Sequence, residues 1–161
     1  MIPIQNIYYM LSYAFQVLNE QGYKSVATEH FENVADLCAA ILIKGLSKQL
    51  KRGLMKDYIP KREPLTALRG KMEISETLKT NSIIKRQVVC SYDEFSENAY
   101  MNRIIKTTML RLMVADVDKS RKKEMKKLLV FLGNVEPLPI YSINWNLRYD
   151  RNNQTLSLIH I

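Results

Sequence analysis

An acidic residue followed two positions later by lysine is the pattern in this chain that could do the most demanding chemistry. In metal-dependent nucleases such acids hold a divalent cation against a phosphate, and the lysine orients or activates water. Among the 16 Asp and Glu residues only Glu124 fits, in Glu124-Met125-Lys126. Because this triplet lies in a helical, lysine-rich stretch rather than on a strand, we interpret it as a coincidence.

The two cysteines and two histidines offer little further chemistry. Cys38 lies in an apolar helical run and Cys90 in a strand-like segment, so both are interpreted as small buried hydrophobes. A zinc site needs about four nitrogen or sulfur ligands at characteristic spacings, and a cysteine nucleophile would have only His30 as its base. We therefore expect no catalytic residue, metal ligand or cofactor-binding residue in this chain.

The composition describes a basic domain. The chain has 161 residues, a net charge of +8 and 47% hydrophobic residues. No stretch approaches the roughly 18 apolar residues that a membrane helix needs, and the first residues lack the basic segment of a signal peptide. These features exclude collagen, a coiled-coil rod, a disulfide scaffold and an integral membrane protein. We expect a soluble, cytoplasmic domain without membrane contact.

Apolar residues at helical spacing predict four main helices. These are residues 4–19, 29–52, 97–115 and 118–132. Thr28 and Ser96 are the expected N-caps of the second and third helices. A shorter helix is expected at about 75–80.

The segment between the second and third main helices changes to period 2. Residues 68–74 alternate between apolar and charged side chains, as a strand does. Pro60 and Pro64 restrict the preceding arm to the edge of a sheet. The pattern predicts strands at about 57–74 and 86–92, and a further short strand at 140–143. The expected fold class is α+β, a mainly helical domain with a β-hairpin or finger insertion at about 56–92.

A cluster of basic residues covers the outer face of the fourth predicted helix. Only Glu124 interrupts it, and such a face is either a solvated helix surface or a surface for nucleic acid or an acidic partner. The candidate DNA-facing residues are Arg121, Lys122, Lys123, Lys126 and Lys127. From the residues alone, the chain is a basic α+β domain that binds something, and a stand-alone nucleic-acid-binding domain is one alternative.

Five sequence blocks, in order, strongly resemble the McrC family, the nuclease-bearing subunits of McrBC restriction systems, which depend on modified cytosine such as 5-methylcytosine. The blocks are residues 2–15 (IPIQNIYYMLSYAF), 51–58 (KRGLMKDY), 68–73 (LRGKME), 92–106 (YDEFSENAYMNRIIK) and 145–153 (WNLRYDRNN). The resemblance covers about residues 2–155. No single block is decisive, but their shared order and spacing make the resemblance specific.

The resemblance implies a function in DNA restriction. The N-terminal part of a McrC-like protein docks on a ring of McrB-like AAA+ subunits, inserts a finger into its pore and stimulates GTP hydrolysis. The finger would be residues 56–92, and the residues expected to meet the ring are Lys61, Arg62, Arg69 and Lys71. GTP and Mg²⁺ would belong to the partner, and DNA would be reached through the complex.

The family pattern also implies a C-terminal PD-(D/E)xK nuclease domain, which would bind the divalent metal. The metal-binding acids and the lysine of that domain are absent from this sequence. We therefore expect residues 1–155 to be a McrC-like N-terminal domain that is not itself catalytic. The last six residues, LSLIHI at 156–161, are what CTG-TCT-CTT-ATA-CAC-ATC encodes, which matches a transposon end used in sequencing-library preparation. We expect these six residues to be non-native read-through.

Overall fold

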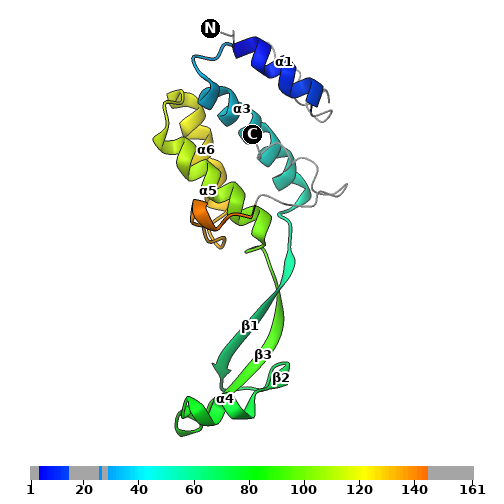
Figure 1. The fold of residues 1–161 in the computed structure, drawn as a ribbon, viewed down its shortest axis with the longest axis vertical. Coiled ribbons are helices and arrows are strands. Elements are labelled where there is room, and N and C mark those ends of the chain that lie inside the picture. Colours follow the sequence, from blue (N-terminus) through cyan, green and yellow to red (C-terminus); the bar gives the residue numbers. More distant parts are fainter. Residues whose placement is uncertain (1–3, 15–25, 27–28, 145–161) are drawn as a thin grey trace. The chain divides into compact units, whose positions relative to one another are not determined.

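The protein is described by a computed structural model that covers residues 4–14, 26 and 29–144. Two compact units make up the chain (Figure 1). Met1–Leu54 and Tyr100–Ile161 form the first, which we call the helical unit, and Met55–Ala99 form the second, which we call the finger. The predicted α+β class is confirmed, because helices dominate the described residues and the described strands form one three-stranded antiparallel sheet.

Two structural expectations fall on residues outside the described ranges. They are the end of the first predicted helix at 15–19 and the read-through at 156–161. Both stay predictions.

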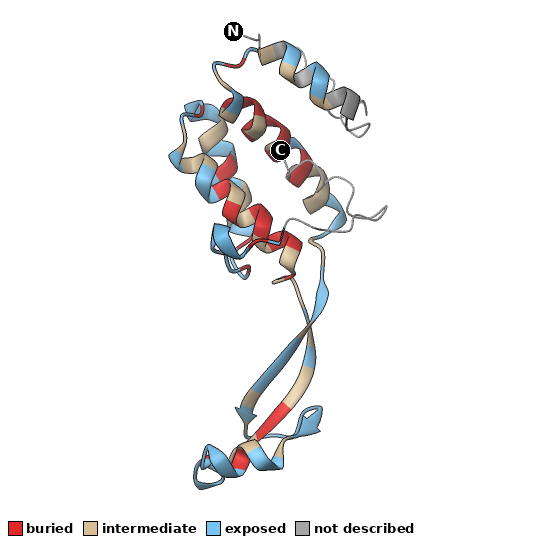
Figure 2. Cartoon of the chain, viewed as in Figure 1, coloured by how far each residue is buried: buried red, intermediate tan, exposed pale blue. Residues whose placement is uncertain are grey.

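The helical unit packs its helices around an apolar core. Its elements are α1 (Ile4–Ala14), α3 (Val34–Arg52), α5 (Tyr100–Val114), α6 (Lys119–Phe131) and the 3₁₀ turn η3 (Ile140–Ser142). The largest fully buried apolar side chains come from α3, α5 and α6 and include Leu37, Ile105, Met109 and Met125. Buried positions recur along α3 and α5 in Figure 2. On α1, Ile4, Ile7 and Leu11 pack against a cluster that contains Val26 and Phe31.

Helix α3 begins five residues later than the predicted start at residue 29. Asn33, in an extended conformation, is its N-cap, and the Asn33 side-chain oxygen accepts a hydrogen bond from the Asp36 amide at 2.9 Å. Asparagine is a stronger N-cap than threonine, so Asn33 and not Thr28 sets the start. The helix ends at Gly53, as expected, where φ is 95°.

The two following helices differ in how well the sequence defines them. Helix α6 lies within the predicted 118–132, because the Asp118 side chain caps it by accepting from the Ser120 amide at 2.8 Å. Helix α5 starts at Tyr100 and not at residue 97. Ser96 does not cap it, because Ser96 is still paired in a strand and its hydroxyl accepts from the Asn98 amide in a turn.

The prediction of a short strand at 140–143 is wrong, because Ile140–Ser142 form the 3₁₀ turn η3. Pro139 precedes it with φ −60°, and the Ser142 amide and hydroxyl both donate to the Pro139 carbonyl, at 3.0 and 2.7 Å. These bonds close the turn.

The sheet of the finger has the order β1-β3-β2, with both pairs antiparallel. Its elements are β1 (Asp57–Leu65), β2 (Lys71–Met72), the helix α4 (Ile74–Lys79), the 3₁₀ turn η2 (Ser82–Lys85) and β3 (Val88–Ser96). The β1–β3 ladder runs from Asp57 opposite Ser96 to Leu65 opposite Val88. Strand β1 is an edge strand, as Pro60 and Pro64 predict.

Two strand predictions need correction. Residues 57–74 do not form one strand, because β1 ends at Leu65 and the chain turns at Gly70, where φ is 67°, before the two-residue β2. Strand β3 extends to Ser96, four residues past the predicted end. Three of the four added residues are polar, and alternation failed to reveal the extension because its side chains, and those opposite them on β1, are exposed or half-buried.

Candidate functional site

The four basic finger residues named from the sequence lie on and beside one sheet. Arg62 on β1 and Lys71 on β2 both pair with Ser91 of the central strand β3. Directly opposed residues project to the same side of a sheet, so Arg62 and Lys71 share one face. Lys61 pairs with Tyr92 and therefore belongs to the opposite face.

Glu73 organises the face that carries Arg62 and Lys71. One Glu73 carboxylate oxygen accepts from the Ser91 hydroxyl at 2.9 Å and lies 3.5 Å from Lys71 Nζ, and the other lies 3.5 Å from Arg62 Nη2. The Ser91 hydrogen bond, together with the charges of Lys71 and Arg62, lowers the pKa of Glu73. Both cations keep most of their side chains in solvent, 55% for Arg62 and 79% for Lys71.

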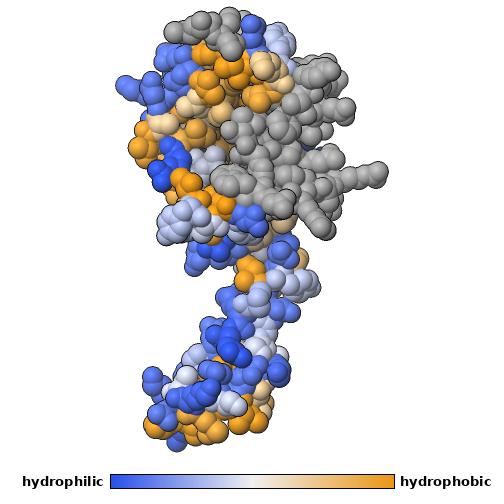
Figure 3. Space-filling model, in the orientation of Figure 1, coloured by the Kyte–Doolittle hydropathy of each residue, from blue (hydrophilic) through white to orange (hydrophobic). Residues whose placement is uncertain are grey.

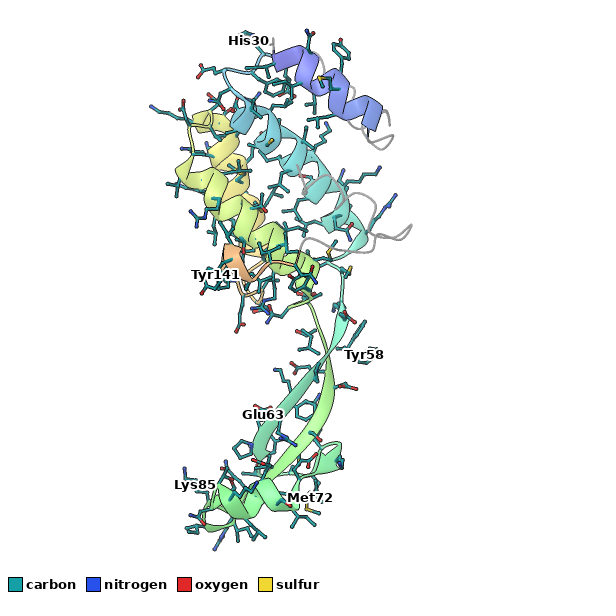
Figure 4. All side chains as sticks on the ribbon, viewed as in Figure 1. His30, Tyr58, Glu63, Met72, Lys85 and Tyr141 are labelled. Atoms are coloured by element: carbon teal, nitrogen blue, oxygen red, sulfur yellow. The ribbon has the colours of Figure 1, made fainter. Side chains whose placement is uncertain are left out.

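The opposite face carries a second set of pairs. Lys61 Nζ lies 2.5 Å from Glu94, and this bond raises the pKa of Lys61 and lowers that of Glu94. The Tyr92 hydroxyl hydrogen-bonds Glu63, which raises the pKa of Tyr92, and the Arg69 guanidinium lies 4.0 Å from the centroid of the Tyr92 ring. The sheet of the finger therefore presents paired charges on both faces, and Figure 4 labels one of these residues, Glu63. We call its two long strands, β1 and β3, the shaft.

These pairs hold the cations in place while leaving them able to change partners. Exposed ion pairs contribute little to stability, because water competes for both charges. An approaching protein surface with carboxylates can therefore take over Arg62 or Lys71 at small cost. Chemically, these exposed paired charges are suited to electrostatic recognition of a partner.

Acidification is expected to weaken the face organised by Glu73. The pKa of Glu73 is lowered in the folded chain, so its contribution is present above the ordinary glutamate pKa of about 4.3 and is lost as pH falls through the folded value. The Glu73→Gln variant should melt at a lower temperature than the unchanged chain at about pH 6, and the gap should be smaller at about pH 3. Equal gaps at both pH values, in thermal melts followed by circular dichroism, would contradict this.

The basic face of α6 is only partly what the sequence predicted. Lys123, Lys126 and Lys127 are exposed and Lys122 is half-buried. Arg121, however, does not lie on the outer face.

The Arg121 side chain is 16% exposed and faces inward. It pairs with Asp36 at 2.5 Å and with Glu29 at 2.9 Å, and its guanidinium lies 4.8 Å from the centroid of the Phe31 ring. Sequence reasoning missed this network, although an aspartate inside the apolar run of α3 was a signal that a cation must cover it.

An exposed aromatic pair on the shaft was also not predicted from the sequence. The rings of Tyr58 and Phe95 lie on opposed positions of β1 and β3, with their centroids 5.0 Å apart, and both side chains are exposed. Figure 4 labels Tyr58. The signal was weak, because two aromatic residues 37 positions apart show their proximity only when the strand register is known.

In the described part of the chain, the residue types that could bind a metal do not form a cluster. Glu124 and Lys126 are exposed on α6, while Met125 between them is fully buried. No group of three or more His, Cys, Asp or Glu residues that could hold a metal ion occurs within residues 4–14, 26 and 29–144. Cys90 is buried, and burial raises the pKa of the Cys38 thiol. A thiolate nucleophile needs a lowered pKa, so the raised pKa of Cys38 argues against that role.

None of the helices in the described part of the chain combines the length and apolar character needed to cross a bilayer.

Comparison with known proteins places the chain in a family. Residues 4–158 match the family model described as McrBC 5-methylcytosine restriction system component. A curated relative is the type IV methyl-directed restriction enzyme EcoKMcrBC of Escherichia coli (strain K12), which is 33% identical over 112 residues. That alignment covers 70% of this chain and 32% of the relative, so the chain spans about a third of the length of the protein that it matches.

Two solved structures share the fold. The cryo-EM structure of the Thermococcus gammatolerans McrBC complex matches with a TM-score of 0.66 and 17% identity, over 98% of this chain and 50% of that chain. A half-complex from a tetradecameric assembly of Thermococcus gammatolerans McrB AAA+ hexamers with bound McrC matches with a TM-score of 0.64 and 15% identity. It covers 97% of this chain and 38% of that chain. The match to the family model spans nearly the whole chain, and the resemblance to McrC is confirmed: the chain belongs to the McrBC 5-methylcytosine restriction system component family.

Proposed function

We propose that this chain is the part of a McrC-like subunit that docks on a ring of McrB-like AAA+ GTPases through its finger and raises their GTP turnover. GTP and Mg²⁺ are bound by the partner, and the divalent metal for DNA cleavage belongs to a nuclease domain outside these 161 residues. DNA is reached through the complex, in the cytoplasm. Membership of the family and the fold shared with McrC-containing assemblies support this proposal.

The observation that carries the proposal is the two-sided charge pattern of the shaft. Both faces of the sheet carry exposed cations, because Arg62 and Lys71 are exposed on one face and Lys61 on the other. Neighbouring strands lie about 4.8 Å apart, so the two-stranded shaft is narrow enough to be surrounded. The central opening of a ring surrounds whatever enters it. A ribbon with charged side chains on both faces can make polar contacts with such an opening on two sides.

Removing the two cations that share Glu73 should weaken stimulation of the ring. The double variant Arg62→Ala, Lys71→Ala is expected to need a roughly tenfold higher concentration for half-maximal GTP turnover, because two surface charge contacts at up to about 1 kcal/mol each are lost. The measurement is GTP hydrolysis by the purified McrB-like partner as this chain is titrated.

The matched control removes two charges from the helical unit. Lys123→Ala, Lys126→Ala takes away the same charge from exposed positions of α6. We expect its stimulation curve to overlay that of the unchanged chain. The proposal is wrong if the unchanged chain does not raise GTP turnover, or if the two double variants stimulate equally well.

The same pair of variants tests a second candidate function, DNA binding by the chain alone. The exposed Lys123, Lys126 and Lys127 of α6 favour it. Binding of this kind weakens steeply with salt, because neutralised phosphates release counterions. DNA affinity that is lost in Lys123→Ala, Lys126→Ala, without any effect of the chain on the GTPase, would select this alternative.

A further inference from the structure

The end of the finger exposes apolar side chains that its own fold does not cover. We call this set the apolar tip. It consists of Leu68, Met72, Ile74, Leu78, Ile83 and Ile84, whose side chains are between 45% and 81% exposed. All six lie in the segment that connects β1 to β3. In Figure 3 hydrophobic residues gather at this end of the finger, whereas most of the shaft is hydrophilic. Soluble proteins rarely leave such a patch without a partner.

Helix α4 has its polar and apolar sides reversed relative to an ordinary surface helix. Its one buried residue is Thr77, whose hydroxyl donates to the Glu73 carbonyl at 2.8 Å and accepts from the Val89 amide at 2.9 Å. Ile74 and Leu78 are spaced i, i+4, so they share a face, and both are exposed. The apolar side chains of α4 are therefore not used to fold the finger.

The 3₁₀ turn η2 repeats this reversal. Its buried residue is Ser82, and Ile83 and Ile84 face solvent. Residues in the left-handed region flank the turn, Asn81 at φ 52° and Arg86 at φ 56°. Non-glycine residues adopt this region at a cost in free energy. The chain thus accepts backbone strain at both ends of a turn that presents two isoleucines to solvent.

Positive charge surrounds the apolar tip. Residues 74–87 contain three basic side chains and one acidic side chain, an excess of two positive charges. Lys79, Lys85 and Arg86 are all exposed, and Figure 4 labels Lys85 and Met72 in this region. A second copy of the tip would carry the same excess and would be repelled. The complementary partner is an apolar surface bordered by carboxylates.

We propose that the apolar tip is an anchor that seats on an apolar, acid-bordered surface of the McrB-like ring subunits, separately from the charge contacts of the shaft. This inference rests on the proposed function, since it names the surface of the same partner. Apolar burial holds the finger in the ring and is not screened by salt, whereas the contacts of Arg62 and Lys71 are. Raising the salt concentration should therefore weaken the charge contacts of the finger and leave the contacts of the apolar tip in place.

The test replaces Ile83 and Ile84 by serine in the full chain. The dissociation constant for the McrB-like ring, assembled with a non-hydrolysable GTP analogue, is measured by biolayer interferometry at about 0.1 M and about 0.5 M salt. We expect Ile83→Ser, Ile84→Ser to raise it by roughly tenfold or more at both salt concentrations. The deficit of Arg62→Ala, Lys71→Ala should instead shrink at the higher concentration.

The matched control is Val114→Ser, Val130→Ser, which alters two apolar side chains of the helical unit that are 87% and 76% exposed. Its dissociation constant should equal that of the unchanged chain. The Val89 amide donates a hydrogen bond to the Thr77 hydroxyl. Its protection from hydrogen exchange reports whether each variant keeps its finger folded. If the double variant loses this protection, the single variant Ile84→Ser replaces it.

The outcomes separate the anchor from the proposed function. Ring binding by the unchanged chain that is equally tight in the serine variants overturns the anchor alone. No ring binding by the unchanged chain overturns both. Binding to phosphatidylserine vesicles, or self-association, that disappears in the serine variants while ring binding persists would assign the tip to a membrane or a second copy and also overturn the anchor.

Discussion

Replacing Gly70 by alanine is expected to unpair β2 from β3 and to destabilise the finger by about 3 kcal/mol. A Cβ at this position would lie 2.4 Å from the backbone oxygen of Ser91 and 2.7 Å from Tyr92 Cβ. Both are fixed parts of the central strand, so neither can move aside. The residue also has φ 67°, where an L side chain is strained. The sheet must therefore open or shift.

Hydrogen exchange at the Glu73 amide measures this effect. That amide donates to the Val89 carbonyl at 2.8 Å, and its exchange should be about a hundredfold faster in Gly70→Ala. Gly53→Ala is the control, because Gly53 also has a positive φ, 95°, but a Cβ there meets nothing within 4 Å. Its effect should be confined to the end of α3. Unchanged protection of Glu73 in Gly70→Ala would show that the predicted clash does not occur.

Replacing Asp36 by alanine is expected to cost the chain about 3 kcal/mol of unfolding free energy, because it removes the buried partner of an ion pair. Asp36 is 2% exposed. One of its oxygens pairs with Arg121, and the other accepts from the Asp118 amide at 3.0 Å. The change leaves Arg121 with the more exposed Glu29 as its ion-pair partner and removes the acceptor of a backbone donor at the start of α6.

Urea unfolding, compared with two controls, tests this expectation. Glu29→Ala removes the exposed partner of Arg121 and should cost less than about 1 kcal/mol. Lys123→Ala, on the exposed face of α6, should stay within about 0.5 kcal/mol of the unchanged chain. Asp36→Asn keeps an acceptor for the Asp118 amide and should fall between. If Asp36→Ala costs no more than Glu29→Ala, the pair is not the structural link that its geometry indicates.

Local signals in the sequence predicted the elements that are decided locally. The apolar repeat over 118–132 located α6, and the predicted end of the second helix at residue 52 matches the end of α3. Pro60 and Pro64 correctly indicated an edge strand. In each case the deciding interaction spans a few residues, so the pattern itself contains it.

Features that depend on distant partners could not be predicted. Asp36 and Arg121 are 85 positions apart, and without the packing of α3 on α6 nothing distinguishes Arg121 from its lysine neighbours. The candidate site shows the same limit. Sequence located Lys61, Arg62, Arg69 and Lys71 in the finger, but their carboxylate and aromatic partners depend on the strand register.

The apolar tip was missed for a different reason. An alternating segment such as 68–74 predicts that its apolar side faces a core, yet Leu68, Met72 and Ile74 are exposed. Periodicity records that a face is apolar and does not record what covers it. The residue of α4 that does contact β3 is Thr77, whose hydroxyl oxygen accepts a hydrogen bond from the Val89 amide.

The register of the shaft has a mechanical consequence. Both long strands run from the Asp57–Ser96 pair to the Leu65–Val88 pair, and the chain enters through β1 and leaves through β3 at the same end. A pull on the far end is therefore shared by two covalent backbones in parallel, and little of it shears the ladder between them. Such a ribbon resists tension along its length far better than forces that peel its strands apart. A finger of this build can transmit axial force along its length without separation of its strands.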